Sequence, residues 1–199
     1  LRTMQNPDFE EQSRILRAFH KVKIFRSDMQ VMCDSLVYVE ADSAFDFYGE
    51  PVLWSEENQL TAEHIRVYMV DQKPERMQMN GVAFVASQAD TSLFDQMRGK
   101  EMTGFFTDNR LTKILVTGNG ETVYYATDED VIVGANKTVC SDLIIHLKDN
   151  KISKVVYTSQ PDGTYYPLSM FPDDEALLSG FMWLDKWRPR SWEDVFFWK

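Results

Sequence analysis

The 199-residue chain has little of what most small metal-binding or disulfide-stapled domains depend on. Its two cysteines, Cys33 and Cys140, are too few for a disulfide framework and form no Cys-x-x-Cys pair. The three histidines, His20, His64 and His146, are far apart in the sequence and form no His-x-x-x-His motif. We therefore expect no metal site and no cofactor. The cysteines are interpreted as small buried hydrophobes, although an oxidising compartment would allow a bridge between them.

Catalytic motifs that depend on glycine are also absent. The chain has no Gly-x-Ser-x-Gly elbow and no Walker-type phosphate loop, and Gly118-Asn119-Gly120 is interpreted as a hairpin turn. A glycosidase needs a pair of carboxylates, but here such pairs occur only in polar turn segments, where acids are solvated. These segments are Glu56-Glu57, Asp128–Asp130 and Asp173–Glu175. The sequence predicts that the chain is not an enzyme.

Charge of one sign dominates, and long apolar runs are missing. With 21 basic and 31 acidic residues the formal net charge is -10, which argues against a nucleic-acid partner. No apolar run is as long as the stretch of about 18 residues that a membrane-spanning helix needs, so we expect only peripheral membrane contact. The chain starts without an apolar signal segment, so we expect any signal sequence to be removed or upstream. Lys21, Lys23 and Arg26 form a basic spot that would suit a phosphate or sugar acid, but a solvated strand edge is the simpler interpretation.

The main pattern in the sequence is an alternation of apolar and polar residues with a period of two. Between His20 and Thr158, apolar residues recur on alternate positions, as in Val22 and Ile24. No amphipathic helix of about ten residues separates these segments, which disfavours a parallel α/β fold. Thr107–Arg110 predicts a hairpin turn. Thr91–Gly99 lacks a clean period and is expected to be a loop or short helix.

A short pattern of a small residue, two polar or small residues and an aliphatic residue repeats along the chain. It occurs at Cys33–Leu36, Ala62–Ile65 and Cys140–Leu143, with a degenerate copy at Lys100–Thr103. The copies lie roughly 30 to 40 residues apart, as in stacked supersecondary units. We expect each unit to be a pair of strands that meet at a corner, and the stack to form two facing antiparallel sheets.

The interior between two such sheets is either filled by side chains or left open as an apolar groove. An open groove would suit acyl chains, whose transfer is worth about 0.8 kcal/mol for each buried CH₂ group. The residues that we expect to line it are Val22, Ile24, Val52, Trp54, Ile65, Val67, Phe84, Phe106, Ile114, Val116 and Ile145.

The composition divides the chain into three parts. Residues 1–19 are expected to be an N-terminal extension with a short helix near Pro7, and residues 20–158 the stacked strands. Residues 159–199 form an irregular, partly helical tail that opens with a turn at Pro161–Thr164 and holds four of the five tryptophans. We expect this tail either to cap the open end of the sheets or to dock on a partner.

At this point the residues resemble a known family. Gly49–Trp54 followed by Leu60–Ile65 is similar to the OstA-like proteins, relatives of the lipopolysaccharide-transport protein A. Cys33–Tyr38, Gly118–Tyr125 and Gly134–Lys137 fit the same order of motifs. The resemblance covers about residues 20–158 and implies an open β-jellyroll of stacked antiparallel strands. The tail and an apparent insertion at Thr91–Lys100 depart from the smallest members of the family.

The resemblance also implies a function. It predicts a periplasmic module that binds lipopolysaccharide or a related lipid and shields its acyl chains on the way to the outer membrane. It further implies end-to-end association with other β-jellyroll transport proteins, or with itself, through edge strands. The alternative is a non-catalytic structural or interaction protein of the cell envelope, with a closed sandwich core.

Overall fold

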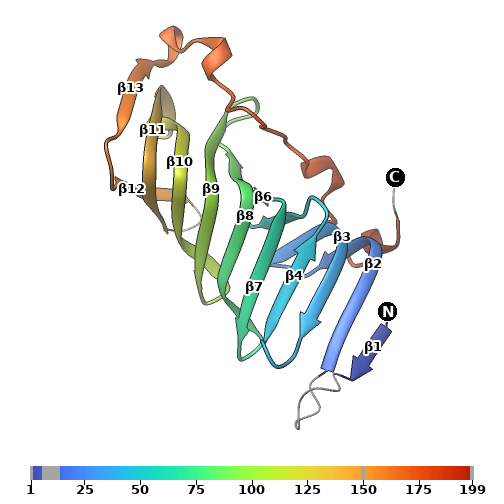
Figure 1. The fold of residues 1–199 in the computed structure, drawn as a ribbon. Coiled ribbons are helices and arrows are strands. Elements are labelled where there is room, and N and C mark those ends of the chain that lie inside the picture. Colours follow the sequence, from blue (N-terminus) through green and yellow to red (C-terminus); the bar gives the residue numbers. More distant parts are fainter. Residues whose placement is uncertain (1, 6–13, 149–150, 198–199) are drawn as a thin grey trace.

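The computed structural model describes residues 2–5, 14–148 and 151–197. Thirteen antiparallel strands form one continuous sheet (Figure 1). In chain order they are β1 (Arg2–Gln5), β2 (Arg14–Phe25), β3 (Met29–Val39), β4 (Ala44–Tyr48), β5 (Val52–Ser55), β6 (Asn58–Thr61), β7 (His64–Val70), β8 (Lys73–Gln88), β9 (Phe94–Thr107), β10 (Arg110–Asp128), β11 (Val131–Lys148), β12 (Lys151–Tyr157) and β13 (Asp162–Pro167). The predicted all-β jellyroll is confirmed.

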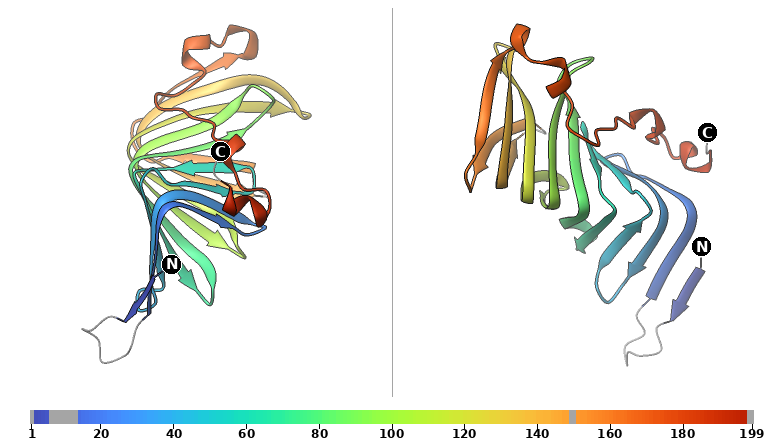
Figure 2. Two further views of the ribbon diagram at one scale, coloured as in Figure 1. Left: turned by 90° about the vertical axis from the view of Figure 1, so that its right-hand side faces the viewer. Right: turned by 45° about the horizontal axis from the view of Figure 1, so that its top comes forward.

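The long strands bend in the middle, so one continuous sheet folds into two facing sheets (Figure 2). Strand β8, for example, pairs with β7 through residues 73–80 and with β6 through residues 84–87. Sheet 1 holds β1, β4, β7, β12 and one half of each long strand. Sheet 2 holds β5, β6, β13 and the other halves.

The bends form a fold line built from left-handed residues. Gly49, Gly81 and Gly118 have φ of +75°, +74° and +74°, and Gly49 and Gly81 leave no room for a Cβ against Asp34 and Glu63. The pairing register of the long strands shifts at the same bends. The predicted corners at Cys33–Leu36 and Ala62–Ile65 lie on this line. The prediction of a hairpin turn at Gly118–Gly120 is wrong, because these residues make the bend inside β10.

Replacing Gly49 by alanine is expected to lower the free energy of unfolding by about 2–3 kcal/mol. The new Cβ would lie 2.5 Å from Asp34 Cβ, an atom tied to the backbone that cannot swing away, at a φ that L-residues avoid. Gly180→Ala is the matched control, since its φ is +84° but no atom lies within 4 Å of the added Cβ. Urea unfolding of both variants checks this, and equal losses would rule out the steric contribution.

Three other expectations differ from the structure. Most of Thr91–Gly99 is neither a loop nor a short helix, because β9 begins at Phe94; both faces of the strand are largely buried there, which hides the alternation. Pro161–Thr164 is not a turn, since β13 begins at Asp162. The expected boundary at residue 20 falls inside β2, whereas the helix expected near Pro7 lies outside the described residues.

The turn between β9 and β10 is confirmed. Asp108 and Asn109 have φ of +50° and +65°, which matches the two left-handed residues of a tight hairpin. Besides β13, the described part of the tail contains four short 3₁₀ helices, η1 (Leu168–Met170), η2 (Asp173–Glu175), η3 (Asp185–Trp187) and η4 (Glu193–Phe196). No helix in the described ranges is long and apolar enough to cross a membrane.

The main core fills the space between the sheets along the middle of the molecule. Its fully buried members include Ile65, Met77, Ile114 and Ile145. Cys33 and Cys140 are both free and buried, as predicted, and burial raises the pKa of the Cys33 thiol to about 12. Neither thiol is therefore a ready nucleophile at neutral pH.

Candidate functional site

A cavity of about 510 Å³ opens between the two sheets near the N-terminal strands. Ile24 and Met29 of sheet 2 form one wall. The other wall is the inner face of sheet 1, where the rings of Tyr38 and Phe45 lie 4.5 Å apart and those of Phe45 and Phe47 lie 6.2 Å apart. The full lining is Ile24, Arg26, Met29, Tyr38, Glu40, Ser43, Phe45, Phe47, Val67, Met69, Asp71 and Gln72.

The cavity has an apolar floor and a polar rim. Its polar residues, such as Glu40, Asp71 and Gln72, come from the turns at the strand ends, whereas the apolar ones come from strand interiors. The size and the lining suit one apolar group of a small ligand with a polar end left at the mouth. No group of three or more metal-ligating side chains occurs in the described part of the chain.

Eight of the eleven predicted groove residues face the interior. Ile24 and Val67 line the cavity itself, and Val22 packs against the core from its margin. The other five, which belong to the filled core, are Ile65, Phe106, Ile114, Val116 and Ile145. The interior is thus filled along the middle of the molecule and hollow near β2, β3, β4 and β7.

Val52, Trp54 and Phe84 point to the opposite face of sheet 2 and cannot line a groove between the sheets. On β5 it is Leu53 that belongs to the main core, so strand alternation turns its two neighbours outward. All three are buried all the same. The tail packs on Phe84, and it binds Gln30 and Gln59, the cross-strand neighbours of Trp54.

The sequence reasoning missed Tyr38 and Phe45. Phe45 alternates with Asp46 and Phe47, a signal that could have identified it, but Tyr38 lies between Val37 and Val39 and shows no alternation.

The tail is a strap, which we define as residues 168–197. It crosses the outer face of sheet 2 at a steep angle to the strands, from β13 to β2 (Figures 1 and 2). The strap does not cover the cavity between the sheets, whose lining holds no strap residue, and docking of the tail on a partner stays a prediction. A second apolar cluster forms beneath it, in which Leu178, Phe181 and Trp183 pack on Phe84 and neighbouring residues of sheet 2.

Buried glutamines hold the strap by its backbone. Gln96 Nε2 donates to Ala176 O at 2.8 Å, and Leu178 N donates back to Gln96 Oε1 at 2.8 Å. Gln59 makes the same paired contact, donating to Met182 O and accepting from Leu184 N, both at 2.7 Å. An extended segment thus receives from side chains the hydrogen bonds that a neighbouring strand would provide.

These glutamines belong to one row across sheet 2. Cross-strand pairing runs from Gln30 through Trp54 to Gln59, and then through Ala86 to Gln96. Gln30 accepts a hydrogen bond at 2.6 Å from Nε of Arg188, which lies further along the strap. Because the row follows the sheet sideways, it fixes the strap at regular intervals along its length.

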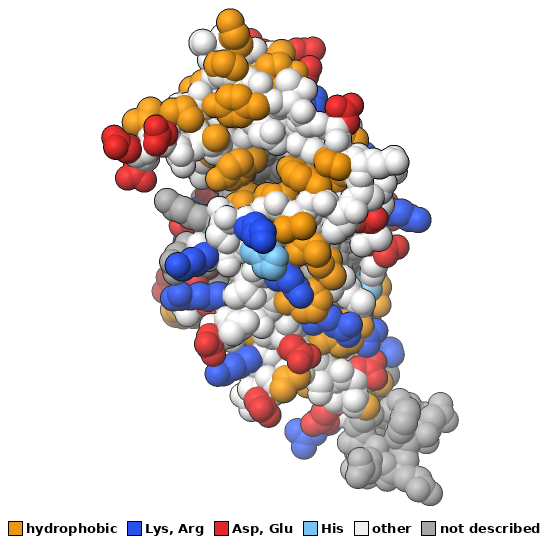
Figure 3. Space-filling view, turned by 90° about the vertical axis from the view of Figure 1, so that its left-hand side faces the viewer, with side chains coloured by type: hydrophobic (Ala, Val, Ile, Leu, Met, Phe, Trp, Pro, Cys, Tyr) orange, Lys and Arg blue, Asp and Glu red, His pale blue; other side chains and the backbone are white. Residues whose placement is uncertain are grey.

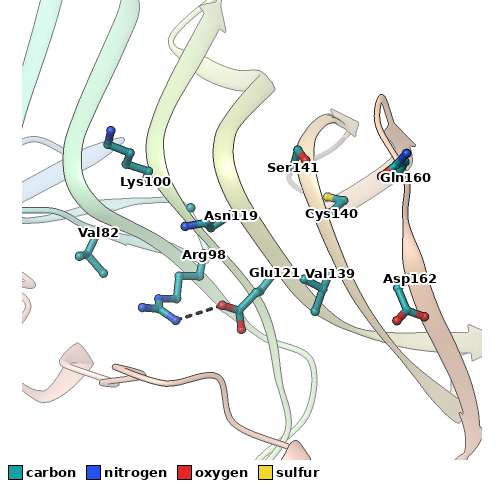
Figure 4. A pocket seen from close by; sticks show the side chains of 11 residues that line it. Val82, Arg98, Lys100, Asn119, Glu121, Val139, Cys140, Ser141, Gln160 and Asp162 are labelled. Carbon is teal, nitrogen blue, oxygen red and sulfur yellow. Dashed lines mark hydrogen bonds and ion pairs between the residues drawn. The ribbon is translucent and has the colours of Figure 1, made fainter.

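A second hollow, of about 790 Å³, lies on the outside of the fold line beside β13 (Figure 4). Arg98 and Glu121 form an ion pair across its floor at 3.1 Å. Exposed valines, Val82 and Val139, are its only large apolar side chains. The hollow is shallow and its lining is mixed in polarity, so an apolar ligand would bury little apolar surface there.

Among the described carboxylates, Asp95 alone has a strongly raised pKa, and it lies on β9 on the same face as Met97. Burial raises its pKa to about 6, although the hydrogen bond that it accepts from Tyr125 N at 2.8 Å acts in the opposite direction. Its charged form is thus disfavoured by the fold.

Asp95→Asn is expected to stabilise the protein at neutral pH by about 2 kcal/mol. The folded pKa lies above the usual value of 3.8, so the native state is favoured below about pH 4 and loses this advantage as the pH rises through 6. Asparagine keeps an oxygen for the Tyr125 N–H without the charge. Unfolding measured against pH, with the exposed Asp128→Asn as control, checks this; a gain that persists at pH 3 would contradict it.

Comparisons with known proteins bear on the fold. No protein-family model matches the sequence, and no curated protein matches it. The structure is similar to that of LptH, the LptA-homologous periplasmic component of the lipopolysaccharide transport device of Pseudomonas aeruginosa. The TM-score is 0.53 at 14% identity, and the match covers 71% of this chain and 100% of the LptH chain. The chain therefore has an LptA-like fold.

Proposed function

We propose that this protein is a non-catalytic periplasmic carrier that shields an acyl chain of lipopolysaccharide, or of a related lipid, during transport to the outer membrane. The observation that carries the proposal is the apolar cavity of about 510 Å³ between the sheets, which opens to solvent at a polar rim. Each CH₂ group that leaves water for such a cavity contributes about 0.8 kcal/mol. The likeness of the fold to LptH supports the same role.

The edges of the jellyroll support association with similar proteins. Strands β12 and β13 each pair only with β11 in the described ranges, which leaves their outer edges available for strand addition. Figure 3 shows this end of the molecule, where hydrophobic side chains are exposed beside lysine and arginine side chains. We propose another β-jellyroll, of the same or a different chain, as the partner there.

One feature favours a second candidate function, that of a structural or interaction protein of the cell envelope. The core is filled along the middle of the molecule, as in a closed sandwich. Such a protein would bind no lipid in the remaining cavity.

Native mass spectrometry with purified lipopolysaccharide separates the two. We expect a stoichiometric adduct that detergent displaces, and at least tenfold weaker binding in the double variant Met29→Gln/Met69→Gln, which makes both walls of the cavity polar at nearly constant shape. Met170→Gln/Met182→Gln is the matched control, since these side chains are 71% and 56% exposed on the strap. Equal binding by both variants, or no adduct with the folded protein, would favour the structural role.

A further inference from the structure

The strap ends in a corner that differs from the rest of the surface. We define the C-terminal corner as Lys23 together with residues 185–197. Here η4 packs on β2, and Lys23 Nζ donates to the carbonyl oxygens of Phe197 at 2.8 Å and Asp194 at 3.5 Å. Asp194 in turn accepts hydrogen bonds from the backbone N–H groups of Arg190 and Ser191. The corner is therefore fixed on the sheet by its own hydrogen bonds.

Large aromatic side chains project from this corner into solvent. Trp192, Phe196 and Phe197 are 64%, 72% and 65% exposed, although Phe171, Phe181 and Trp183 further back along the strap are partly buried against sheet 2. The rings of Trp192 and Phe196 contact each other edge to face, with centroids 6.3 Å apart. Three such side chains held together in water by an ordered backbone form an interaction surface.

A cationic hollow of about 250 Å³ lies beside these rings. It is lined by Lys23, Lys186, Trp187, Arg188, Arg190, Asp194 and Phe197. Four cations and one carboxylate, Asp194, line the hollow, and a second carboxylate, Asp185, pairs with Arg188 and Arg190 at its rim, in a chain whose net charge is -10. The concentration of positive charge at one corner of an acidic protein marks it as a place for an anion.

The four basic side chains differ in their contacts and in their exposure. Arg188 is anchored in the fold, donating to Gln30 Oε1 and to Glu56 O, so its charge is fixed at the base of the hollow. Arg190 is 60% exposed and pairs with Asp185 at the rim, and Lys186 lies over the ring of Trp187 at 5.2 Å. Burial, and to a smaller extent the nearby Arg190, lower the pKa of Arg188, whereas the carboxylates of Asp185, Glu57 and Glu56 act in the opposite direction.

We infer that the C-terminal corner docks on an anionic lipid surface. Phosphate head groups enter the hollow against Lys186 and Arg190, while Trp192, Phe196 and Phe197 enter the interfacial layer. Tryptophan and other aromatic rings favour that layer because they have apolar bodies and tolerate a wet boundary. Each basic residue close to an anionic surface adds about 1 kcal/mol, and the combination of the two signals gives reversible attachment.

The corner adjoins the cavity between the sheets. Lys23 and Ile24 are consecutive on β2, and Ile24 lines the cavity from the other face of the strand. Docking through the corner therefore brings the mouth of the cavity to the edge of a lipid surface. That consequence rests on the proposed function, whereas the docking itself does not.

Vesicle flotation tests the inference with the intact chain. We expect the protein to float with vesicles of phosphatidylcholine and phosphatidylglycerol, more weakly in high salt, and much less with phosphatidylcholine alone. Trp192→Ser/Phe196→Ser is expected to reduce binding at least tenfold. Lys186→Gln/Arg190→Gln is expected to remove the preference for the anionic vesicles. The altered aromatic side chains are exposed, so unfolding in urea should change little.

Two control variants alter exposed aromatic, apolar or basic side chains that lie away from the C-terminal corner. Tyr165→Ser/Met170→Ser removes apolar side chains that are 53% and 71% exposed at the other end of the molecule, and Lys73→Gln/Arg110→Gln removes exposed charges. Both should float like the unaltered protein. Absence of flotation, equal loss in the control variants, or binding of inorganic phosphate without binding of vesicles would each overturn the inference. Loss of lipopolysaccharide binding in the cavity would leave it standing.

Discussion

Ile65→Asp is expected to unfold the protein at neutral pH. Ile65 is the second residue of β7 and has no exposed surface, and it lies inside the main core between the two sheets. An aspartate there either holds a charge with no partner or takes up a proton, and either outcome costs about 5 kcal/mol or more when the lost apolar contacts are included. Since small domains have unfolding free energies of about 5–15 kcal/mol, most of the stability is lost. Circular dichroism and urea unfolding measure the effect.

The same strand provides the control. Val70 is 50% exposed at the end of β7, and Val70→Asp is expected to change the unfolding free energy by no more than about 0.5 kcal/mol. If Ile65→Asp stayed folded and lost only the binding of lipid, the centre of the molecule would be an open groove rather than a filled core. This is why a fair test of the cavity uses Met29 and Met69, which lie at its margin.

The sequence was sufficient for the architecture because its main signals are local. An alternation of period two with no intervening helical period indicates antiparallel strands, and the small-polar-polar-aliphatic repeat marks the bends. The same logic failed at Gly118–Gly120, where left-handed residues serve a bend within β10 rather than a turn between strands. A glycine pair looks alike in both settings, and only the pairing of the flanking segments separates them.

It was harder to predict which side chains of sheet 2 point toward the main core, because both faces of this sheet are buried. Trp54 and Phe84 are as apolar as the residues of the main core, and nothing local shows that they lie under the strap. Conversely, Gln59 and Gln96 look like solvent-facing residues, yet their side chains are almost completely buried. The crowded aromatic residues of the tail showed that it packs on something, but the surface that it covers is a long-range contact.

The glutamine side chains that bind the strap are expected to contribute strongly to the free energy of unfolding. Gln59→Ala and Gln96→Ala are each expected to lower the free energy of unfolding by about 2–3 kcal/mol, and both together by about 5 kcal/mol. Each substitution removes two short hydrogen bonds and leaves a strap carbonyl and N–H without a partner, in one case the N–H of the buried Leu178. Gln88→Ala is the control, because that exposed side chain makes a single bond to Thr91 O at 3.1 Å.

Hydrogen exchange locates the effect within the strap. The amide protons of Leu178 and Leu184 are donated to glutamine side chains, so in the double variant they should exchange much faster than those of the central strands. If both amides stayed protected, the aromatic cluster around Phe181 and Trp183 would be sufficient to hold the strap. If the whole molecule lost protection together, the strap would be an integral layer of the fold, and the jellyroll would depend on it for the burial of Trp54 and Phe84. The paired geometry of the glutamines favours local release, because each contact joins one side chain to one short stretch of backbone and leaves the pairing of the strands untouched.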